Sequence, residues 1–271
     1  MQKWGLNIVG SIVLFLTLFS CQKKEDFANI DVIGHGGNGL QNPNTLFHDN
    51  SLQSIEIALA TEGCNGIEVD VQLSSDHTLW LYHDEQLAAE TDGEGCLAGK
   101  NDAYLAAVVY STIHKEKLIQ LAELPESSLS GKKLYLDVRH MNACNGNEVN
   151  MSAYISAINS FRAANPTMLD LIICTGSVSW MSAFKTAGYT VMAQSISMDH
   201  YAQITTSFPQ LDGIVSANGD ISKEDVSLIH ADGRKVVIFD IRAAKATRRA
   251  FNKLPDALMT DNIRNALIEK Y

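Results

Sequence analysis

The sequence contains 271 residues, of which 46% are hydrophobic, and its formal net charge at pH 7 is −10. A chain of this length and composition can form one large globular domain with a full hydrophobic core, and a single α/β barrel has about 250 residues. The acidic balance argues against a nucleic-acid-binding protein and against electrostatic docking on anionic lipid. It is compatible with a small anionic ligand whose charge is screened by a metal ion.

The first 20 residues have the pattern of a secretory signal. Lys3 precedes an apolar run from Ile8 to Phe19, and polar residues follow Cys21 at once. The run ends in Leu-Phe-Ser-Cys, which is similar to a bacterial lipobox, so we expect lipid attachment at Cys21. An ordinary cleaved signal, in which Cys21 is incidental, is the alternative interpretation.

The expected organisation of the chain has three parts. Residues 1–20 form the signal peptide, residues 21–28 form a lipidated polar tether, and residues 29–271 form one barrel domain. The protein is then an exported bacterial lipoprotein tethered to a membrane, in the periplasm or on the outer-membrane surface. No run after residue 20 is long and apolar enough to cross a bilayer. The oligomeric state does not follow from the sequence.

From residue 29 onward, short apolar segments alternate with helical patterns. Such alternation is typical of a parallel sheet, and eight units predict closure into a (β/α)8 TIM barrel. An open doubly wound sheet is the second candidate, but no glycine-rich phosphate-binding motif follows any strand. The expected strands span 30–34, 66–71, 133–139, 169–175, 190–196, 213–217, 235–241 and 257–260. The expected helices span 51–62, 102–113, 118–127, 149–164, 178–187, 201–207, 223–231 and 243–253, with a closing helix after them.

A β-hairpin and a loop are expected as an insertion after the second strand. Only four polar residues (74–77) separate that strand from the apolar run 78–84, so the two runs should pair antiparallel. A turn at the centre of this link places Glu68 opposite His83, on one face of the hairpin. A slip of one residue would turn His83 to the other side. Residues 85–101 carry no period and are expected to form a loop over the site.

Two carboxylates interrupt the second predicted strand. Glu68 and Asp70 are two residues apart among Ile67, Val69 and Val71, so they share one face while the aliphatic side chains share the other. Like charges side by side repel, and their common face is costly to bury without a counter-charge. A hard divalent cation is the simplest counter-charge.

A third carboxylate, Asp137, interrupts the next predicted strand and shares a face with Arg139. In a TIM barrel the site residues lie at the carboxyl ends of the strands, where His35, Glu68, Asp70 and Arg139 are expected. Three carboxylates from two neighbouring strands suit Mg²⁺ or Ca²⁺ better than a soft metal. The alternative is an arginine–carboxylate cluster that holds no ion.

Several short motifs follow one another in a recognisable order. They are His-Gly-Gly at 35–37, Asp-Asn-Ser at 49–51, Glu-Val-Asp-Val at 68–71, His-Asp at 83–84, Leu-Tyr-Leu-Asp-Val-Arg at 134–139 and Asp-Ala-Leu-Met-Thr-Asp at 256–261. Their order resembles the glycerophosphodiester phosphodiesterase family, within the superfamily of phosphodiesterases similar to phosphoinositide phospholipase C. The resemblance covers roughly residues 31–265. It implies a TIM barrel that hydrolyses a phosphodiester, most directly a glycerophosphodiester, to glycerol 3-phosphate and an alcohol.

The resemblance also implies a role for individual residues. Two imidazoles serve as acid and base, since this group titrates in the range that phosphodiester cleavage at neutral pH requires. One divalent ion, Mg²⁺ or Ca²⁺, binds the carboxylates and the phosphate oxygens of a small-molecule substrate. The implied set is catalytic His35 and His83, metal-binding Glu68, Asp70 and Asp137, and substrate-binding Arg139 and Asn50.

Several positions depart from the family pattern, among them Arg139, which replaces a lysine. Gly36 replaces the arginine of His-Arg-Gly, Asp49 and Asp137 replace glutamates, and Phe239 replaces a tryptophan. These changes leave the predicted metal and histidine residues in place but weaken the case for glycerol-phosphate specificity. Two alternatives stay open. One is a lipid-directed enzyme of the same barrel, similar to a phospholipase or sphingomyelinase D, and the other is a non-catalytic surface lipoprotein that binds a phosphorylated ligand.

Four cysteines follow Cys21, and disulfides are possible in an exported protein, but the pairing does not follow from the sequence. Cys64 and Cys96 are expected near the same end of the fold. Cys174 lies in an apolar run and is expected to be a buried free thiol. Six other histidines are expected on the surface or in loops, namely His48, His77, His114, His140, His200 and His230.

Overall fold

The computed structural model describes residues 27–39, 46–142, 144–194 and 197–271. The signal peptide predicted at 1–20 and the lipidation site predicted at Cys21 lie outside these ranges, so both stay predictions. Within these ranges, none of the helices has the length and apolar character needed to cross a membrane.

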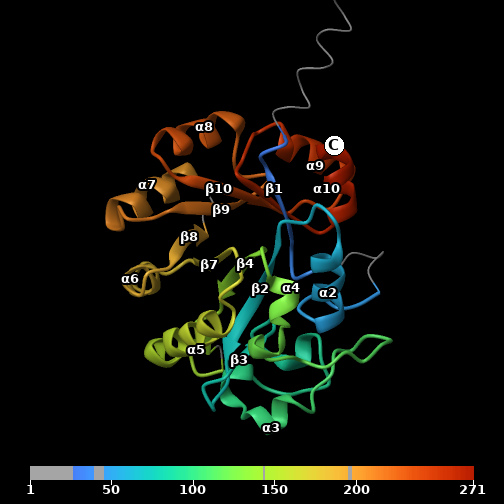
Figure 1. Ribbon diagram of the computed structural model, residues 1–271. Coiled ribbons are helices and arrows are strands. Elements are labelled where there is room, and N and C mark those ends of the chain that lie inside the picture. Colours follow the sequence, from blue (N-terminus) through green and yellow to red (C-terminus); the bar gives the residue numbers. More distant parts are fainter. Residues whose placement is uncertain (1–26, 40–45, 143, 195–196) are drawn as a thin grey trace, which may run out of the picture.

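Eight parallel strands close into a barrel, which confirms the predicted TIM-barrel fold (Figure 1). The barrel strands are Asp31–Gly34 (β1), Gly66–Leu73 (β2), Lys133–Val138 (β4), Asp170–Thr175 (β7), Thr190–Gln194 (β8), Gly213–Ala217 (β9), Lys235–Phe239 (β10) and Ala257–Thr260 (β11). Closure occurs at β1, which pairs with β11 on one side and with β2 on the other. Each strand lies where the sequence predicts it, with ends that differ by two residues at most.

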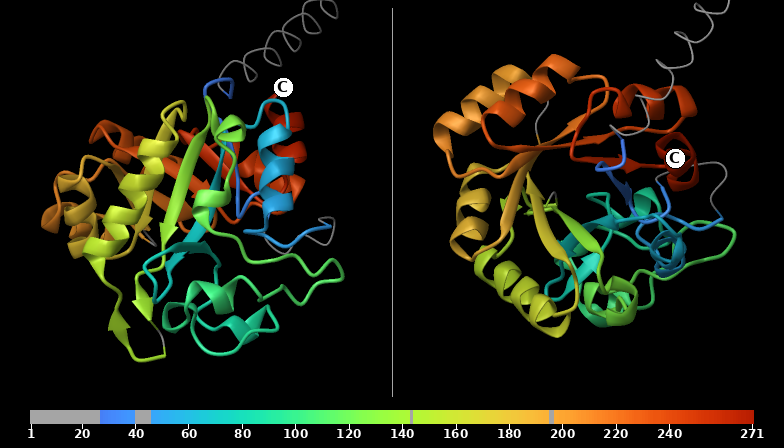
Figure 2. Two further views of the ribbon diagram at one scale, coloured as in Figure 1. Left: turned by 60° about the horizontal axis from the view of Figure 1, so that its bottom comes forward. Right: turned by 45° about the horizontal axis from the view of Figure 1, so that its top comes forward.

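Helices surround the ring of strands (Figure 2, right). They are Leu52–Ala60 (α2), Met151–Ala164 (α5), Val178–Thr186 (α6), Met198–Ser207 (α7), Lys223–Ala231 (α8), Ala244–Phe251 (α9) and Ile263–Lys270 (α10). Several begin at a polar residue whose side chain accepts a backbone N–H of the first turn, as Ser51, Asn150 and Ser222 do. These caps explain why the predicted helix starts are close to the observed ones.

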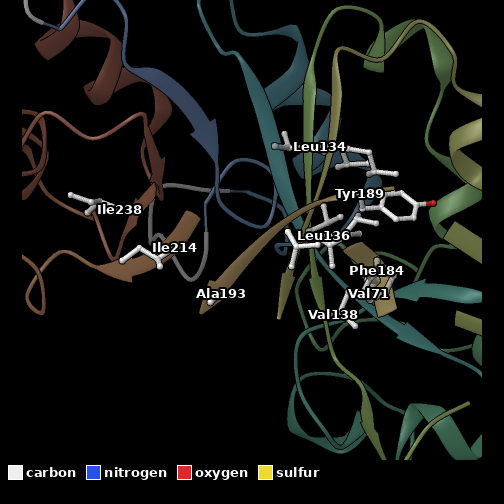
Figure 3. Packing of buried hydrophobic residues seen from close by; sticks show 14 of the residues in the cluster. Val71, Leu134, Leu136, Val138, Phe184, Tyr189, Ala193, Ile214 and Ile238 are labelled. Atoms are coloured by element: carbon white, nitrogen blue, oxygen red, sulfur yellow. The ribbon is translucent and has the colours of Figure 1, made fainter. Parts of the chain in front are cut away.

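Two hydrophobic layers hold the barrel together. Aliphatic residues on the outer faces of the strands, such as Val71, Leu134 and Leu136, belong to one large buried cluster with Phe184 of α6 (Figure 3). Alternate residues of the same strands face the interior of the ring, where Tyr135 belongs to a second, smaller cluster. The charged residues of these strands alternate with the outer aliphatic residues and therefore lie on the inner face.

The segment between β2 and β4 differs from the prediction. It contains β3 (Leu79–Leu81), α3 (Asp102–Leu105), α4 (Glu126–Leu129) and three short 3₁₀ turns, η1 (Leu87–Ala89), η2 (Leu97–Gly99) and η3 (Leu121–Glu123). The predicted helices 102–113 and 118–127 are therefore too long. The intervening chain is extended and bridges Val109 to Lys117, and its apolar side chains join a separate buried cluster with Trp80 and Leu87.

The β2–β3 hairpin is present, but its predicted register is wrong by one residue. Val71 pairs with Leu81, so the antiparallel pairing would place Val69, and not Glu68, opposite His83. The turn is one residue longer than assumed, because the backbone N–H of Ser74 donates to the carbonyl of Thr78. β3 ends at Leu81, and His83 therefore lies beyond the paired strand.

A disulfide joins Cys96 to Cys144, and Cys64 and Cys174 are buried free thiols, as predicted for Cys174. The expectation that Cys64 lies near Cys96 is wrong. Cys64 precedes β2, at the amino end of the barrel, and its thiol donates to the carbonyl of Gly66. Cys96 begins η2, beside the opposite end of β2. Its partner lies between two short strands, Met141–Asn142 (β5) and Asn147–Glu148 (β6), so the disulfide fastens the insertion to the loop after β4.

Candidate active site

A cavity of about 490 Å³ opens at the carboxyl ends of the barrel strands. It is lined by every predicted site residue except Asn50. The lining residues are His35, Glu68, Asp70, His83, Asp137, Arg139, Cys174, Gln194, Val215, Ala217, Asp220, Phe239, Asp240, Arg242, Met259 and Asp261. The barrel thus brings together residues that are more than 200 positions apart in the chain.

Glu68, Asp70 and Asp137 form a compact carboxylate cluster in the wall of this cavity. Asp70 on β2 is the direct neighbour of Asp137 on β4 in the parallel register, and Glu68 lies one pleat earlier on β2. One oxygen from each of the three carboxylates lies within 4.8 Å of the other two, and all three side chains are buried. This set of hard oxygen donors fits a divalent ion such as Mg²⁺ or Ca²⁺.

Burial and the neighbouring charges shift the pKa values of the three acids. Burial, and then the charge of Asp70, raises the pKa of Glu68 to about 8. Burial also raises the pKa of Asp137 to about 6, against the opposing effect of Arg139. For Asp70, burial acts in the same direction, but the charges of Arg139 and His83 and the hydrogen bonds from Asn50 and Arg139 together outweigh it and lower the pKa. The protein alone therefore supplies too little positive charge for three ionised carboxylates.

Arg139 contacts two of these acids directly. Its Nε and Nη2 donate to Oδ1 of Asp70 at 3.1 and 2.7 Å. The same Nη2 lies 3.0 Å from Oδ2 of Asp137. The guanidinium follows β4 directly, and about a third of the side chain stays exposed to the cavity. Arg139 thus partly neutralises the cluster while it remains in reach of a ligand.

Asn50 holds Asp70 through two hydrogen bonds. Its Nδ2 donates to Oδ2 of Asp70 at 2.9 Å, and its Oδ1 accepts the backbone N–H of Asp70 at 3.0 Å. The residue is fully buried and has a left-handed backbone with φ 58°, a conformation that asparagine adopts more readily than most residues. Its observed contacts are therefore with a predicted metal ligand, and its predicted contact with substrate stays a prediction.

His35 is fixed by a carboxylate that the sequence analysis did not assign to the site. Its Nδ1 lies 2.8 Å from Oδ1 of Asp261, and its Nε2 lies 3.9 Å from Oε2 of Glu68. Burial alone would lower the pKa of His35, but the hydrogen bond to Asp261 and the charge of Glu68 raise it to about 9. Asp261 ends the Thr-Asp motif after β11, so its position at a strand end was the signal that could have identified it.

The glycines beside His35 allow the chain to turn sharply into the site. The backbone N–H of Gly36 donates to Oε2 of Glu68 at 2.9 Å. A Cβ on Gly34 would lie 2.0 Å from the carbonyl oxygen of Gly37, a separation that no side chain could tolerate. The turn therefore places His35 and the backbone of Gly36 beside the carboxylate cluster.

His83 reaches the same cavity despite the shifted hairpin register. Its Nδ1 lies 2.7 Å from Oδ1 of Asp84, and 40% of its side chain is exposed. Nε2 of Gln72 donates to the carbonyls of Tyr82 and Asp84 at 2.9 and 2.8 Å, which anchors the chain on both sides of His83. Both cavity histidines thus bind an aspartate through Nδ1, and this leaves Nε2 available for proton transfer.

His48 lies in the loop before α2, as expected, and belongs there to a second, partly buried cluster. Its ring stacks on Tyr110 with 3.9 Å between centroids. Nδ1 lies 3.0 Å from Oδ1 of Asp49, and Nε2 lies 3.6 Å from Oε2 of Glu90. Burial alone would lower the pKa of His48, but the hydrogen bond to Asp49 and the charges of Asp49 and Glu90 raise it to about 9. The cluster joins the insertion to the Asp-Asn-Ser motif.

A barrel whose cavity combines buried carboxylates with two aspartate-bound imidazoles has the features of an acid–base hydrolase. The chain matches the sequence model of the glycerophosphoryl diester phosphodiesterase family over residues 35–265. It belongs to this family and is a phosphoric diester hydrolase. The comparison with curated proteins returned no match.

Solved structures show the same barrel at low sequence identity. A phosphodiesterase from Oleispira antarctica in complex with the product sn-glycerol-3-phosphate is 21% identical, with a TM-score of 0.72 over 88% of this chain and 96% of that one. A glycerophosphoryl diester phosphodiesterase from Parabacteroides distasonis is 16% identical, with a TM-score of 0.68 over 90% and 87% of the two chains. An enzyme from Thermotoga maritima is 16% identical, with a TM-score of 0.67 over 88% and 96%. These likenesses support the fold.

The raised pKa of His48 predicts a specific pH dependence of stability. Because the folded pKa of about 9 exceeds the ordinary value of 6.5, protonated His48 stabilises the fold fully below pH 6.5, and this contribution is lost as the pH rises through 9. Between pH 6 and 9.5, the free energy of unfolding should therefore fall by up to about 3 kcal/mol more in the wild type than in His48→Asn. Urea unfolding at a series of pH values measures this difference.

A second variant, Glu90→Gln, removes one of the charges that raise the pKa of His48, so its pH dependence should be intermediate. Parallel curves of unfolding free energy against pH for the wild type and His48→Asn would contradict the prediction.

Proposed function

We propose that this protein hydrolyses a glycerophosphodiester to glycerol 3-phosphate and an alcohol. The observation that carries the proposal is the common cavity in which three carboxylates lie beside two imidazoles, each with Nδ1 on an aspartate. Membership of the glycerophosphoryl diester phosphodiesterase family supports this substrate class. The Oleispira relative, whose structure contains sn-glycerol-3-phosphate, supports the nature of the product.

Glu68, Asp70 and Asp137 are the residues that would hold one divalent ion, Mg²⁺ or Ca²⁺. Their buried oxygen donors lie within 4.8 Å of one another, and the raised pKa values of Glu68 and Asp137 reflect a shortage of positive charge. When bound, the ion supplies Lewis-acid stabilisation of the charge that develops on the phosphate oxygens. The side chain of Arg139 shares the charge of Asp70 and Asp137 and can contribute one further contact to the phosphate.

His35 and His83 carry the proton transfers in this proposal. One imidazole Nε2 takes a proton from the nucleophile, and the other gives a proton to the leaving alkoxide. A water nucleophile gives glycerol 3-phosphate directly, whereas a substrate hydroxyl gives a cyclic phosphate that a water molecule then opens. Asp261 and Asp84 hold the Nδ1 atoms, so each ring keeps its orientation and its tautomer during the transfer. In this way Asp261 and Asp84 act as positioning residues.

A lipid-directed activity of the same barrel is the second candidate. Two largely exposed aliphatic side chains favour it, since Leu46 is 71% exposed and Ile113 is 91% exposed. Their loops are in contact, because the rings of Phe47 and His114 lie 5.0 Å apart. A screen of the purified protein against glycerophosphodiesters, lysophospholipids and cyclic phosphates discriminates between the two candidates.

Replacement of either cavity histidine should remove the activity and leave the fold intact. His35→Ala and His83→Ala each lose one proton-transfer group, so turnover should fall by a factor of about 10² to 10⁴. Hydrolysis of a glycerophosphodiester is measured, with circular dichroism as the check on folding. His230→Ala, outside the cavity, is the control and should keep full activity. Wild-type turnover in either cavity variant would remove the acid–base assignment.

Removal of divalent ions should stop turnover. Excess chelator should abolish hydrolysis, and readdition of Mg²⁺ or Ca²⁺ should restore it, because Arg139 alone does not balance three carboxylates. Isothermal titration of the chelated protein with each ion should show one site, which Asp137→Asn should weaken. An undiminished rate in excess chelator would eliminate the ion-dependent mechanism.

We also propose that the protein is an exported lipoprotein anchored through Cys21. The support is the sequence pattern of residues 1–21. In a bacterium that expresses the full chain, labelled palmitate should be incorporated into the wild type and not into Cys21→Ser. The wild type should also sediment with membranes. Equal incorporation into both proteins would contradict lipidation at this residue.

A further inference from the structure

We propose that Arg242 binds the phosphate group of the substrate, as a second cationic contact on the side of the cavity that carries His35. This inference rests on the proposed function and adds a specificity-determining residue to it. The sequence analysis assigned no role to Arg242, which is exposed and follows the end of β10.

The charge balance of the cavity favours a second cationic side chain, even with a divalent ion on the carboxylate cluster. Its lining contains six carboxylates but only two guanidinium groups, those of Arg139 and Arg242. A phosphodiester brings one further negative charge into this environment. An anion enters such a cavity only where fixed positive charge outweighs the repulsion by the carboxylates.

Arg139 is partly occupied by the acids of the cluster. Its Nε and Nη2 are both bound to Asp70, and Nη2 also lies 3.0 Å from Asp137. On the opposite side of the carboxylate cluster, Gly36 has no side chain, and its backbone N–H already donates to Glu68. Beside the cluster and the His35 turn, the phosphate therefore has, among the described residues, only the remaining exposed edge of Arg139 as a cationic contact.

Arg242 has more unused hydrogen-bonding capacity than Arg139. Its Nε lies 3.3 Å from Oδ1 of Asp240 and 3.3 Å from Oδ2 of Asp261, and 68% of the side chain is exposed. Within the part of the chain that the structure describes, neither Nη atom has a hydrogen-bond partner. The outer edge of the guanidinium can thus donate two parallel hydrogen bonds to phosphate oxygens.

The position of Arg242 relative to His35 defines the side of the cavity on which the phosphate would lie. Both residues bind the carboxylate of Asp261, His35 through Nδ1 at 2.8 Å and Arg242 through Nε at 3.3 Å. A phosphate held by Arg242 therefore lies on the same side of the cavity as the His35 imidazole. Arg139 approaches from the β4 side, next to Asp70 and Asp137.

The experiment compares Arg242→Gln with a matched control, Arg248→Gln. Arg248 on α9 is 69% exposed and pairs with Glu269 at 2.9 Å, and it lies outside the cavity lining. For each protein, KM and kcat are measured on a glycerophosphodiester, and the Kd of sn-glycerol 3-phosphate is measured by isothermal titration in the presence of Mg²⁺. Arg242→Gln should raise both KM and Kd about tenfold to a hundredfold, with a smaller change in kcat. Arg242→Lys should recover part of the loss, and Arg248→Gln should match the wild type.

The KM and kcat values separate phosphate binding from a purely structural role. If Arg242 only positioned Asp261, the Gln variant would lose kcat while the Kd of sn-glycerol 3-phosphate stayed unchanged, and that result would overturn the inference. An active wild type with unchanged KM and Kd in Arg242→Gln would do the same without touching the proposed function. A wild type that neither hydrolyses the diester nor binds sn-glycerol 3-phosphate would overturn both.

Discussion

The mutual repulsion of Glu68, Asp70 and Asp137 is the constraint on which the site depends. The parallel register of β2 and β4 sets Asp70 beside Asp137, and the apolar layer outside the barrel prevents either strand from turning its acids to solvent. The pKa values of Glu68 and Asp137 rise as a result, to about 8 and about 6. Burying three acids together costs folding free energy unless positive charge or hydrogen-bond donors lie beside them. The neighbouring residues supply such groups.

Three of those neighbours act on the cluster in different ways. Arg139 neutralises the outer edge of Asp70 and Asp137, and the buried amide of Asn50 fixes the inner oxygen of Asp70. The backbone of Gly36 donates to Glu68. Each contact stabilises the ionised form of a carboxylate. Only the guanidinium of Arg139 carries a positive charge, however, so these three contacts set one positive charge against three acids. The remaining imbalance gives the cluster its capacity for a divalent ion.

The sequence was sufficient to predict the strands and the barrel because these follow from local periodicity, and the order of the motifs identified six of the sixteen residues that line the cavity. Alternation in β2 separates Glu68 and Asp70 from the aliphatic residues, and this pattern depends on no distant contact. The hairpin register could not be predicted in this way, because one hydrogen bond between Ser74 and Thr78 decides the length of the turn. The pairing of Cys96 with Cys144 and the stacking of His48 on Tyr110 depend on how the irregular insertion packs, and no period in the sequence reports that.

Although the register of the hairpin is shifted, His83 still lines the cavity. If β3 continued beyond Leu81, strand alternation would turn His83 away from Glu68 and Asp70. The strand instead ends there, and Gln72, on the same face of β2 as the two acids, holds the carbonyls on both sides of His83. The side-chain amide of Gln72, and not strand pairing, therefore positions the chain that carries this imidazole. Asp84 and Asp261 then fix the two rings, one from the insertion and one from the end of the barrel. The two imidazoles are thus held by aspartates from distant parts of the chain, and their relative position depends on the closure of β1 against β2 and β11.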